Sequence, residues 1–194
     1  MSEFLHDLDE NRIYIVVTQT GTMLSRVLKL VTRAEFNHVS VSLDPTLHTM
    51  YSFGRKNPYN PFIGGFVMES PFFGTFKRFS ETDSVVICLT LTEEQKVRIA
   101  RKLEEMYCNR SAYTYNTLGL LLAGIRIHYQ KKNSYYCSEF VKSILEEFGL
   151  ISDTAVGKIP KPIEFLRLHG GSVVYRGKLR LYECPDPICE IHTV

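Results

Sequence analysis

The sequence predicts a single α+β domain over residues 1–194, with an antiparallel sheet packed against helices. The length of 194 residues fits one domain, and neither a repeat nor a linker-like stretch divides the chain. The expected segments follow a mixed order: a strand and a helix, then consecutive strands, then consecutive helices. This order favours an α+β fold over an alternating doubly wound one.

The first quarter of the chain contains the clearest strand patterns. Residues 13–20 are β-branched and aromatic, which predicts a buried strand. Residues 23–33 carry apolar side chains at helical spacing and are expected to form an amphipathic helix. Residues 38–43 alternate as a half-buried strand does, and the Asp44-Pro45 turn signal predicts a returning strand over residues 49–53.

The middle of the chain is predicted to contain a long loop and a central strand. Residues 54–65 are rich in Gly, Pro and Asn, which indicates a loop, and residues 66–69 fit a short strand. Residues 84–91 have the apolar pattern of a central strand. Thr92 and Gln95 form a capping box at the start of the next helix.

Two helices and closing strands are expected in the last third. Residues 116–129 predict a buried helix, although Gly119 and Gly124 weaken it. Apolar side chains recur at helical spacing from Cys137 to residue 148, and Gly149 suits a helix end. Residues 172–182 are expected to close the sheet as one or two strands.

Charge and composition narrow the classes of partner. The formal charge is +2, from 23 basic and 21 acidic side chains, and this balance argues against nucleic acid or a strongly anionic surface as a partner. The acidic, polar start does not resemble a secretory signal, and the apolar run at 118–127 is too short to span a bilayer. We therefore expect a cytoplasmic protein without an integral membrane segment, whose five cysteines are free thiols.

Cys137 and His38 are the candidate catalytic residues. Cys137 lies at the first turn of a predicted helix, where free N–H groups and partial positive charge favour a thiolate. His38 opens a predicted strand, and a base on a strand facing a thiol on a helix is the arrangement that a thiol–imidazole pair requires. The alternatives are a small core cysteine and a hydrogen-bonded structural histidine.

Two motifs carry a family resemblance. NHVSVSLD at residues 37–44 and YCSEFV at residues 136–141 resemble the active-site motifs of circularly permuted NlpC-type papain-like proteins. That group includes YiiX-like proteins and is related to lecithin–retinol acyltransferases. The resemblance spans residues 13 to about 166. It implies a papain-like fold, a nucleophilic thiol at Cys137 and a general base at His38.

The resemblance also implies a polar residue, on the strand after the histidine strand, that orients the imidazole. Counting around the Asp44-Pro45 turn puts Ser52 near that position, where many relatives carry Glu or His. Because Ser52 departs from the family pattern, three alternatives stay open: a weaker orienting bond, a different third residue such as Glu69, or lost catalysis.

Substrate-binding and metal-binding residues are less strongly indicated. Arg55 in the 54–65 segment offers a positive charge for a carboxylate, and Tyr59 offers an aromatic surface. Cys184, Cys189 and His192 hint at a metal, but zinc sites need four ligands with tighter pairing, so neither a metal nor another cofactor is predicted.

The expected function is therefore that of a cysteine peptidase or amidase. It would cleave an amide bond in a peptide-like substrate, and the resemblance extends this to cell-wall-derived peptides. One alternative is a thiol acyltransferase acting on lipid or acyl substrates. Another is a non-catalytic binding domain on the same fold, which Ser52 favours.

Overall fold

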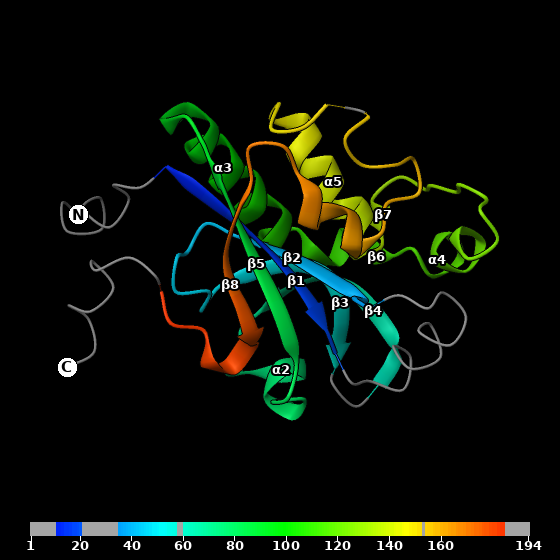
Figure 1. Ribbon diagram of the computed structural model, residues 1–194. Coiled ribbons are helices and arrows are strands. Elements are labelled where there is room, and N and C mark those ends of the chain that lie inside the picture. The colour runs from blue at the N-terminus through cyan, green and yellow to red at the C-terminus, as the bar shows by residue number, and fades with distance from the viewer. Residues whose placement is uncertain (1–10, 21–34, 58–59, 153, 185–194) are drawn as a thin grey trace.

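The computed structural model describes residues 11–20, 35–57, 60–152 and 154–184, and these residues form one six-stranded and one two-stranded sheet (Figure 1). The larger sheet has the order β4-β3-β2-β1-β5-β8, and every neighbouring pair of strands is antiparallel. Its strands are β1 Arg12–Gln19, β2 His38–Ser42, β3 Met50–Asn57, β4 Asn60–Glu69, β5 Asp83–Thr90 and β8 Ser172–Lys178. The small parallel sheet pairs β6 (Thr114–Tyr115) with β7 (Ser134–Tyr135).

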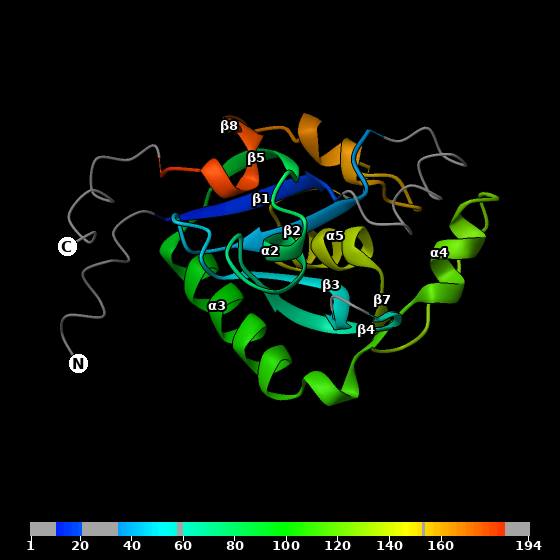
Figure 2. The ribbon, with the colours of Figure 1, turned by 90° about the horizontal axis from the view of Figure 1, so that it is seen from below.

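Helices cover both faces of the larger sheet. The α-helices are α2 Gly74–Arg78, α3 Glu93–Cys108, α4 Thr117–Ala123 and α5 Cys137–Glu147, and the short 3₁₀ segments are η2 Arg110–Ala112, η3 Pro162–Arg167 and η4 Leu179–Leu181. In Figures 1 and 2, α3 and α5 lie on one side of the sheet and α2 on the other. The predicted α+β class with an antiparallel sheet is confirmed.

Strand β1 is buried on both faces because each face of the sheet has its own core. Ile13, Ile15 and Val17 point into the larger core, which the helices α3 and α5 complete. Tyr14 and Val16 point the other way, into a smaller core with Phe76 of α2 and others. Successive strand residues face opposite sides of a sheet, so an unbroken apolar run indicates a strand covered on both sides.

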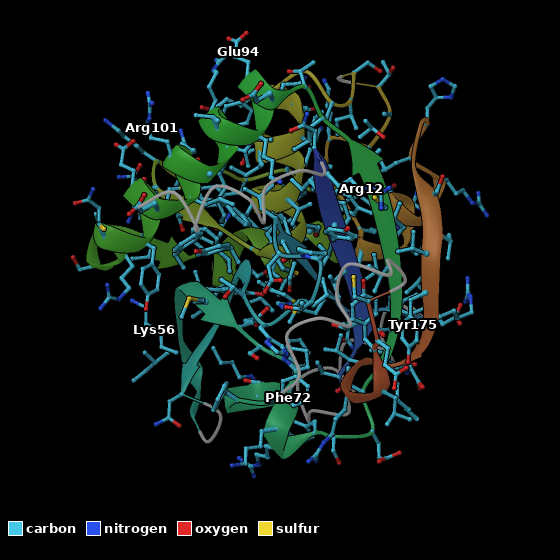
Figure 3. All side chains as sticks on the ribbon, turned by 90° about the vertical axis from the view of Figure 1, so that its left-hand side faces the viewer. Arg12, Lys56, Phe72, Glu94, Arg101 and Tyr175 are labelled. Atoms are coloured by element: carbon cyan, nitrogen blue, oxygen red, sulfur yellow. The ribbon has the colours of Figure 1, made fainter. Side chains whose placement is uncertain are left out.

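The start of α3 follows from its sequence as predicted. The Thr92 hydroxyl accepts from the Gln95 N–H at 3.1 Å, and the Gln95 side chain accepts from the Thr92 N–H at 2.8 Å. This reciprocal capping satisfies two N–H groups that a helix end leaves without partners. Glu94 and Arg101 project from the outer side of α3 (Figure 3).

The predicted loop at residues 54–65 is wrong, because most of the segment forms a β-hairpin. Strand β3 runs on to Asn57 and β4 begins at Asn60, with Gly54 paired to Gly65 and Arg55 to Gly64. A bulge between Arg55 and Asn57 shifts the register. The glycines that suggested a loop instead allow another segment to pack closely against the strand. A Cβ on Gly64, for example, would lie 2.8 Å from Cβ of Tyr115.

The predicted buried helix at residues 116–129 is also wrong in length and burial. The helix α4 covers only Thr117–Ala123, and Leu118, Leu121 and Ile125 are exposed. The expected helix at residues 23–33 lies outside the described residues. Within the part of the chain that is described, no helix is both long and apolar enough to cross a membrane.

Candidate active site

Cys137 is the first residue of α5. Tyr136 precedes it as the N-cap in an extended conformation, and the apolar stripe of the helix, which includes Phe140 and Ile144, packs into the larger core. The Cys137 side chain belongs to that core and the residue is 5% exposed. Since the first N–H groups of a helix have no partner within it, the thiol lies beside a cluster of backbone donors.

The start of α5 is fixed by a buried carboxylate. Glu139 accepts from the Tyr136 N–H at 3.0 Å and from the Asn116 side-chain amide at 3.1 Å through the same oxygen. Burial raises the pKa of Glu139, and these two hydrogen bonds act in the opposite direction. This carboxylate therefore ties the N-terminus of the cysteine helix to the residue that precedes α4.

His38 is the first residue of β2, and its ring is bound by Glu69 at the end of β4. Nε2 of His38 lies 2.9 Å from Oε2 and 3.1 Å from Oε1 of Glu69. The two side chains are only 14% and 12% exposed. A charged pair so poorly hydrated interacts more strongly than one on the open surface.

Ser40 and Phe76 complete the surroundings of this pair. Ser40 lies two residues after His38, so its side chain shares a face of β2 with the imidazole. Its hydroxyl donates to Oε2 of Glu69 at 2.7 Å, which helps to fix the carboxylate. The buried Phe76 ring lies 6.1 Å from the imidazole, centroid to centroid, and shields it from water.

The environment of His38 favours the imidazolium. Burial is the largest single effect and lowers the pKa, but it is outweighed by the Glu69 charge and by hydrogen bonds with Cys137 and Glu69, so the pKa rises to about 10. Nε2 is the ring nitrogen that Glu69 holds. Cys137 is among the groups that raise the pKa of His38, so the two residues predicted from sequence lie near one another, on β2 and on the α5 helix that packs against it.

Ser52 does not hold the imidazole, in contrast to the hairpin count from the sequence. Its hydroxyl donates to the Val39 carbonyl at 2.7 Å, so it bonds to the backbone of the histidine strand. The β3 residue beside the ring is Gly54, where a Cβ would lie 3.6 Å from Cε1 of His38 and 3.1 Å from Oε1 of Glu69. The missing side chain at Gly54 leaves the space through which Glu69 reaches His38.

Two tyrosines also lie near the thiol. Burial raises the pKa of Tyr115 and of Tyr136, and Cys137 and Glu139 raise both further through their negative charge. Both hydroxyls therefore stay protonated and can donate. The Tyr136 hydroxyl is buried and has no hydrogen-bond partner among the described atoms.

A groove of about 780 Å³ lies beside the edge strand β4, between the end of α3 and α2. Glu69 and Arg55 line it, but neither His38 nor Cys137 does, so the groove and the dyad do not coincide. Burial lowers the pKa of Arg55, and the nearby Tyr115 opposes that effect. Tyr59, the other predicted substrate-binding residue, lies outside the described residues, as do Cys189 and His192.

No family model, curated protein or solved structure matches this chain in our comparisons. The site therefore has to be interpreted from its own geometry. Sequence reasoning did not single out Ser40, Gly54, Tyr115 or Tyr136. Ser40 had a usable signal, since a polar residue two positions after a strand histidine shares its face. Tyr136 directly precedes Cys137 in the sequence, whereas Tyr115 had no signal, because only the fold brings it to the cysteine helix.

Proposed function

We propose that this protein is a cysteine hydrolase that cleaves an amide bond in a peptide-like substrate. The hydrogen bond between the His38 imidazole and Glu69, close to Cys137 at the start of α5, is the observation that carries the proposal. A thiol, a base and a third group that orients the base are the parts that nucleophilic catalysis needs. A permuted papain-like fold and a cytoplasmic location are parts of the same proposal.

The reaction would pass through an acyl-enzyme. The Cys137 thiol gives its proton to His38, and the resulting thiolate adds to the amide carbonyl. The N–H of Cys137 at the start of α5 donates to the oxyanion. The imidazolium then protonates the departing amine, and water, deprotonated by His38, hydrolyses the thioester to release the acid and the free thiol.

Acyl transfer is the second candidate, and the exposed apolar side chains of α4 favour it. In that reaction an amine or alcohol takes the place of water in the last step, and an exposed apolar surface would suit an acyl substrate. Adding an amine acceptor to a reaction with a thioester-forming substrate separates the two outcomes, because a transferase gives mainly the amide product and a hydrolase mainly the acid.

Thiol reactivity tests the proposal without knowledge of the substrate. At pH 6 an ordinary thiol is less than about 1% thiolate, whereas a thiolate paired with an imidazolium stays reactive. Iodoacetamide should therefore modify Cys137 at least about tenfold faster than the other cysteines, and His38→Ala should remove that advantage. Mass spectrometry of proteolytic peptides gives the rate at each site.

Cys88 is the matched control within the chain. It is 9% exposed against 5% for Cys137, so both thiols depend on similar local opening for access, but Cys88 belongs to the core on the other face of the sheet. Cys108 is exposed and reports the rate of a freely accessible thiol. Labelling of Cys137 no faster than Cys88 at pH 6 would refute the nucleophile assignment.

A further inference from the structure

The segment that contains α4 exposes apolar side chains to solvent. Leu121 and Ile125 are 65% and 67% exposed. Five large apolar residues are exposed within a stretch of twelve positions: Leu118, Leu121, Ile125, Ile127 and Tyr129. In Figures 1 and 2, α4 stands apart from the sheet and from the other helices. Such a concentration of exposed apolar surface marks an interaction site.

The same segment is positively charged. Arg126, His128, Lys131 and Lys132 alternate with or directly follow the exposed apolar residues. The sequence contains neither Asp nor Glu from residue 106 to residue 138, although the whole chain has 21 acidic side chains. The balanced total charge therefore conceals a local region that is basic and apolar together.

We refer to residues 117–132 as the α4 projection. One side chain, that of Asn116, forms hydrogen bonds near both ends of this segment. The Asn116 side-chain oxygen accepts from the Gly119 N–H at 2.9 Å and caps α4. The Asn116 side-chain amide donates to the Tyr129 carbonyl at 2.9 Å. Strands β6 and β7 pair at its base. The exposed apolar residues therefore lie on a segment that leaves the body of the fold and returns to it at a fixed base.

We propose that the α4 projection docks onto the surface of an anionic lipid bilayer. Leucine and isoleucine side chains insert at the boundary between headgroups and acyl chains, Tyr129 suits the interface itself, and the basic residues face anionic headgroups. A second copy of the chain is a poorer partner, since a two-fold contact would bring the same basic residues face to face.

Docking would also orient the molecule. Strand β7 at the base of the α4 projection leads through Tyr136 directly into Cys137, so the bilayer surface would lie on the same side as the start of α5. Docking itself does not depend on the proposed catalysis. A Cys137→Ala variant should bind vesicles as the unaltered chain does, which keeps the two proposals separately testable.

Co-sedimentation of the full chain with vesicles tests the docking. Binding is expected to vesicles of phosphatidylcholine with phosphatidylglycerol, to weaken as salt rises, and to be much weaker on phosphatidylcholine alone. Leu121→Ser combined with Ile125→Ser should lower the partition coefficient at least about tenfold. Leu181→Ser combined with Val173→Ser is the matched control, because these residues are 69% and 53% exposed elsewhere, and it should leave binding unchanged.

A second pair of variants tests the charge. Lys131→Gln with Lys132→Gln should reduce binding to the anionic vesicles, whereas Lys158→Gln with Lys161→Gln, at exposed sites elsewhere, should not. The proposal would be overturned if the protein co-sediments with neither kind of vesicle. It would also be overturned by a dimer in the absence of lipid that dissociates when Leu121 and Ile125 are replaced by serine, because the α4 projection would then be a contact between copies. Circular dichroism of each variant checks that the fold is kept.

Discussion

The protonation state of His38 decides what the candidate dyad can do at neutral pH. With a pKa raised to about 10, the imidazole is largely protonated in the resting protein. The imidazolium would serve chiefly as the acid that protonates the leaving amine, and Glu69 would keep it charged.

Glu69→Gln should lower the pKa of His38. The amide keeps the shape of the carboxylate but removes the negative charge that stabilises the imidazolium, while the burial that opposes protonation remains. An NMR titration of the histidine ring protons, assigned by comparison with His38→Gln, measures the change. The midpoint of His38 is expected near pH 10 in the unaltered chain and at lower pH in the variant.

Ser52→Ala is the control for this titration. The Ser52 hydroxyl bonds to the Val39 carbonyl, so its loss should leave the pKa of His38 unmoved and lower the free energy of unfolding by about 1 kcal/mol. If Ser52→Ala shifts the His38 titration as far as Glu69→Gln does, then Glu69 is not the residue that sets the charge state of the ring.

The sequence indicated Cys137 and His38 as candidates but left Ser52 and Glu69 open as the residue that holds the imidazole. Local patterns place a cysteine at a helix start and a histidine at a strand start, since both depend on neighbouring residues. The partner of the imidazole depends on which strand lies beside β2 and on what the intervening residue leaves open. Counting residues from the turn leads to Ser52 on β3. In the structure, Glu69 on β4 reaches the imidazole across the space that Gly54 of β3 leaves open.

At the scale of elements, glycine and apolar runs were the misleading signals. Glycines at positions 54, 64 and 65 suggested a loop, yet they lie in paired strands where close neighbours leave little room for side chains. The leucines after Asn116 suggested a buried helix, because an apolar run does not reveal whether protein or something else covers it. The capping box before α3 was reliable because its hydrogen bonds are made within four residues.

Gly54→Ala should damage the site more than the fold. The added Cβ would lie 3.1 Å from Oε1 of Glu69 and 3.3 Å from Cγ2 of Val67, so these side chains must shift and the carboxylate is expected to lose its position against the imidazole. The rate of Cys137 labelling at pH 6 is expected to fall at least about tenfold, toward that of a cysteine without an active base. The labelling assay and a urea unfolding curve measure the two effects separately.

Gly149→Ala is the matched control for Gly54→Ala. Gly149 follows the end of α5 with φ of +69°, and an added Cβ there meets nothing within 4 Å. The substitution should cost about 1 kcal/mol of stability through backbone strain alone and should leave Cys137 labelling unchanged. The argument from Gly54 fails if both variants reduce labelling in proportion to their loss of stability.

At the scale of the whole molecule, the fold class was predictable because the order of segments is a global property of the chain. The candidate site combines elements that are far apart in that order: β2 contains the histidine, β4 the glutamate and α5 the cysteine. These three elements also contribute to the core, so the charged cluster is coupled to folding. The ionisation of His38 should therefore be visible in the stability of the entire protein.

Stability should fall as pH rises from about 6.5 to about 10, because of His38. The pKa of His38 is about 10 in the folded chain against 6.5 for an ordinary histidine, so the folded state holds more protons than the unfolded state within this window. The contribution is complete below pH 6.5 and is lost as the pH passes through the folded-state pKa near 10. It is on the order of a few kcal/mol, since each unit of pKa difference corresponds to about 1.4 kcal/mol.

Urea unfolding at intervals from pH 6 to pH 10 gives the dependence, and His38→Gln, which removes the titrating group, should flatten it. Other groups titrate in the same range in both proteins, so the difference between the two curves reports His38 together with the groups that interact with it. Parallel curves would show that the folded protein does not hold the extra proton on His38.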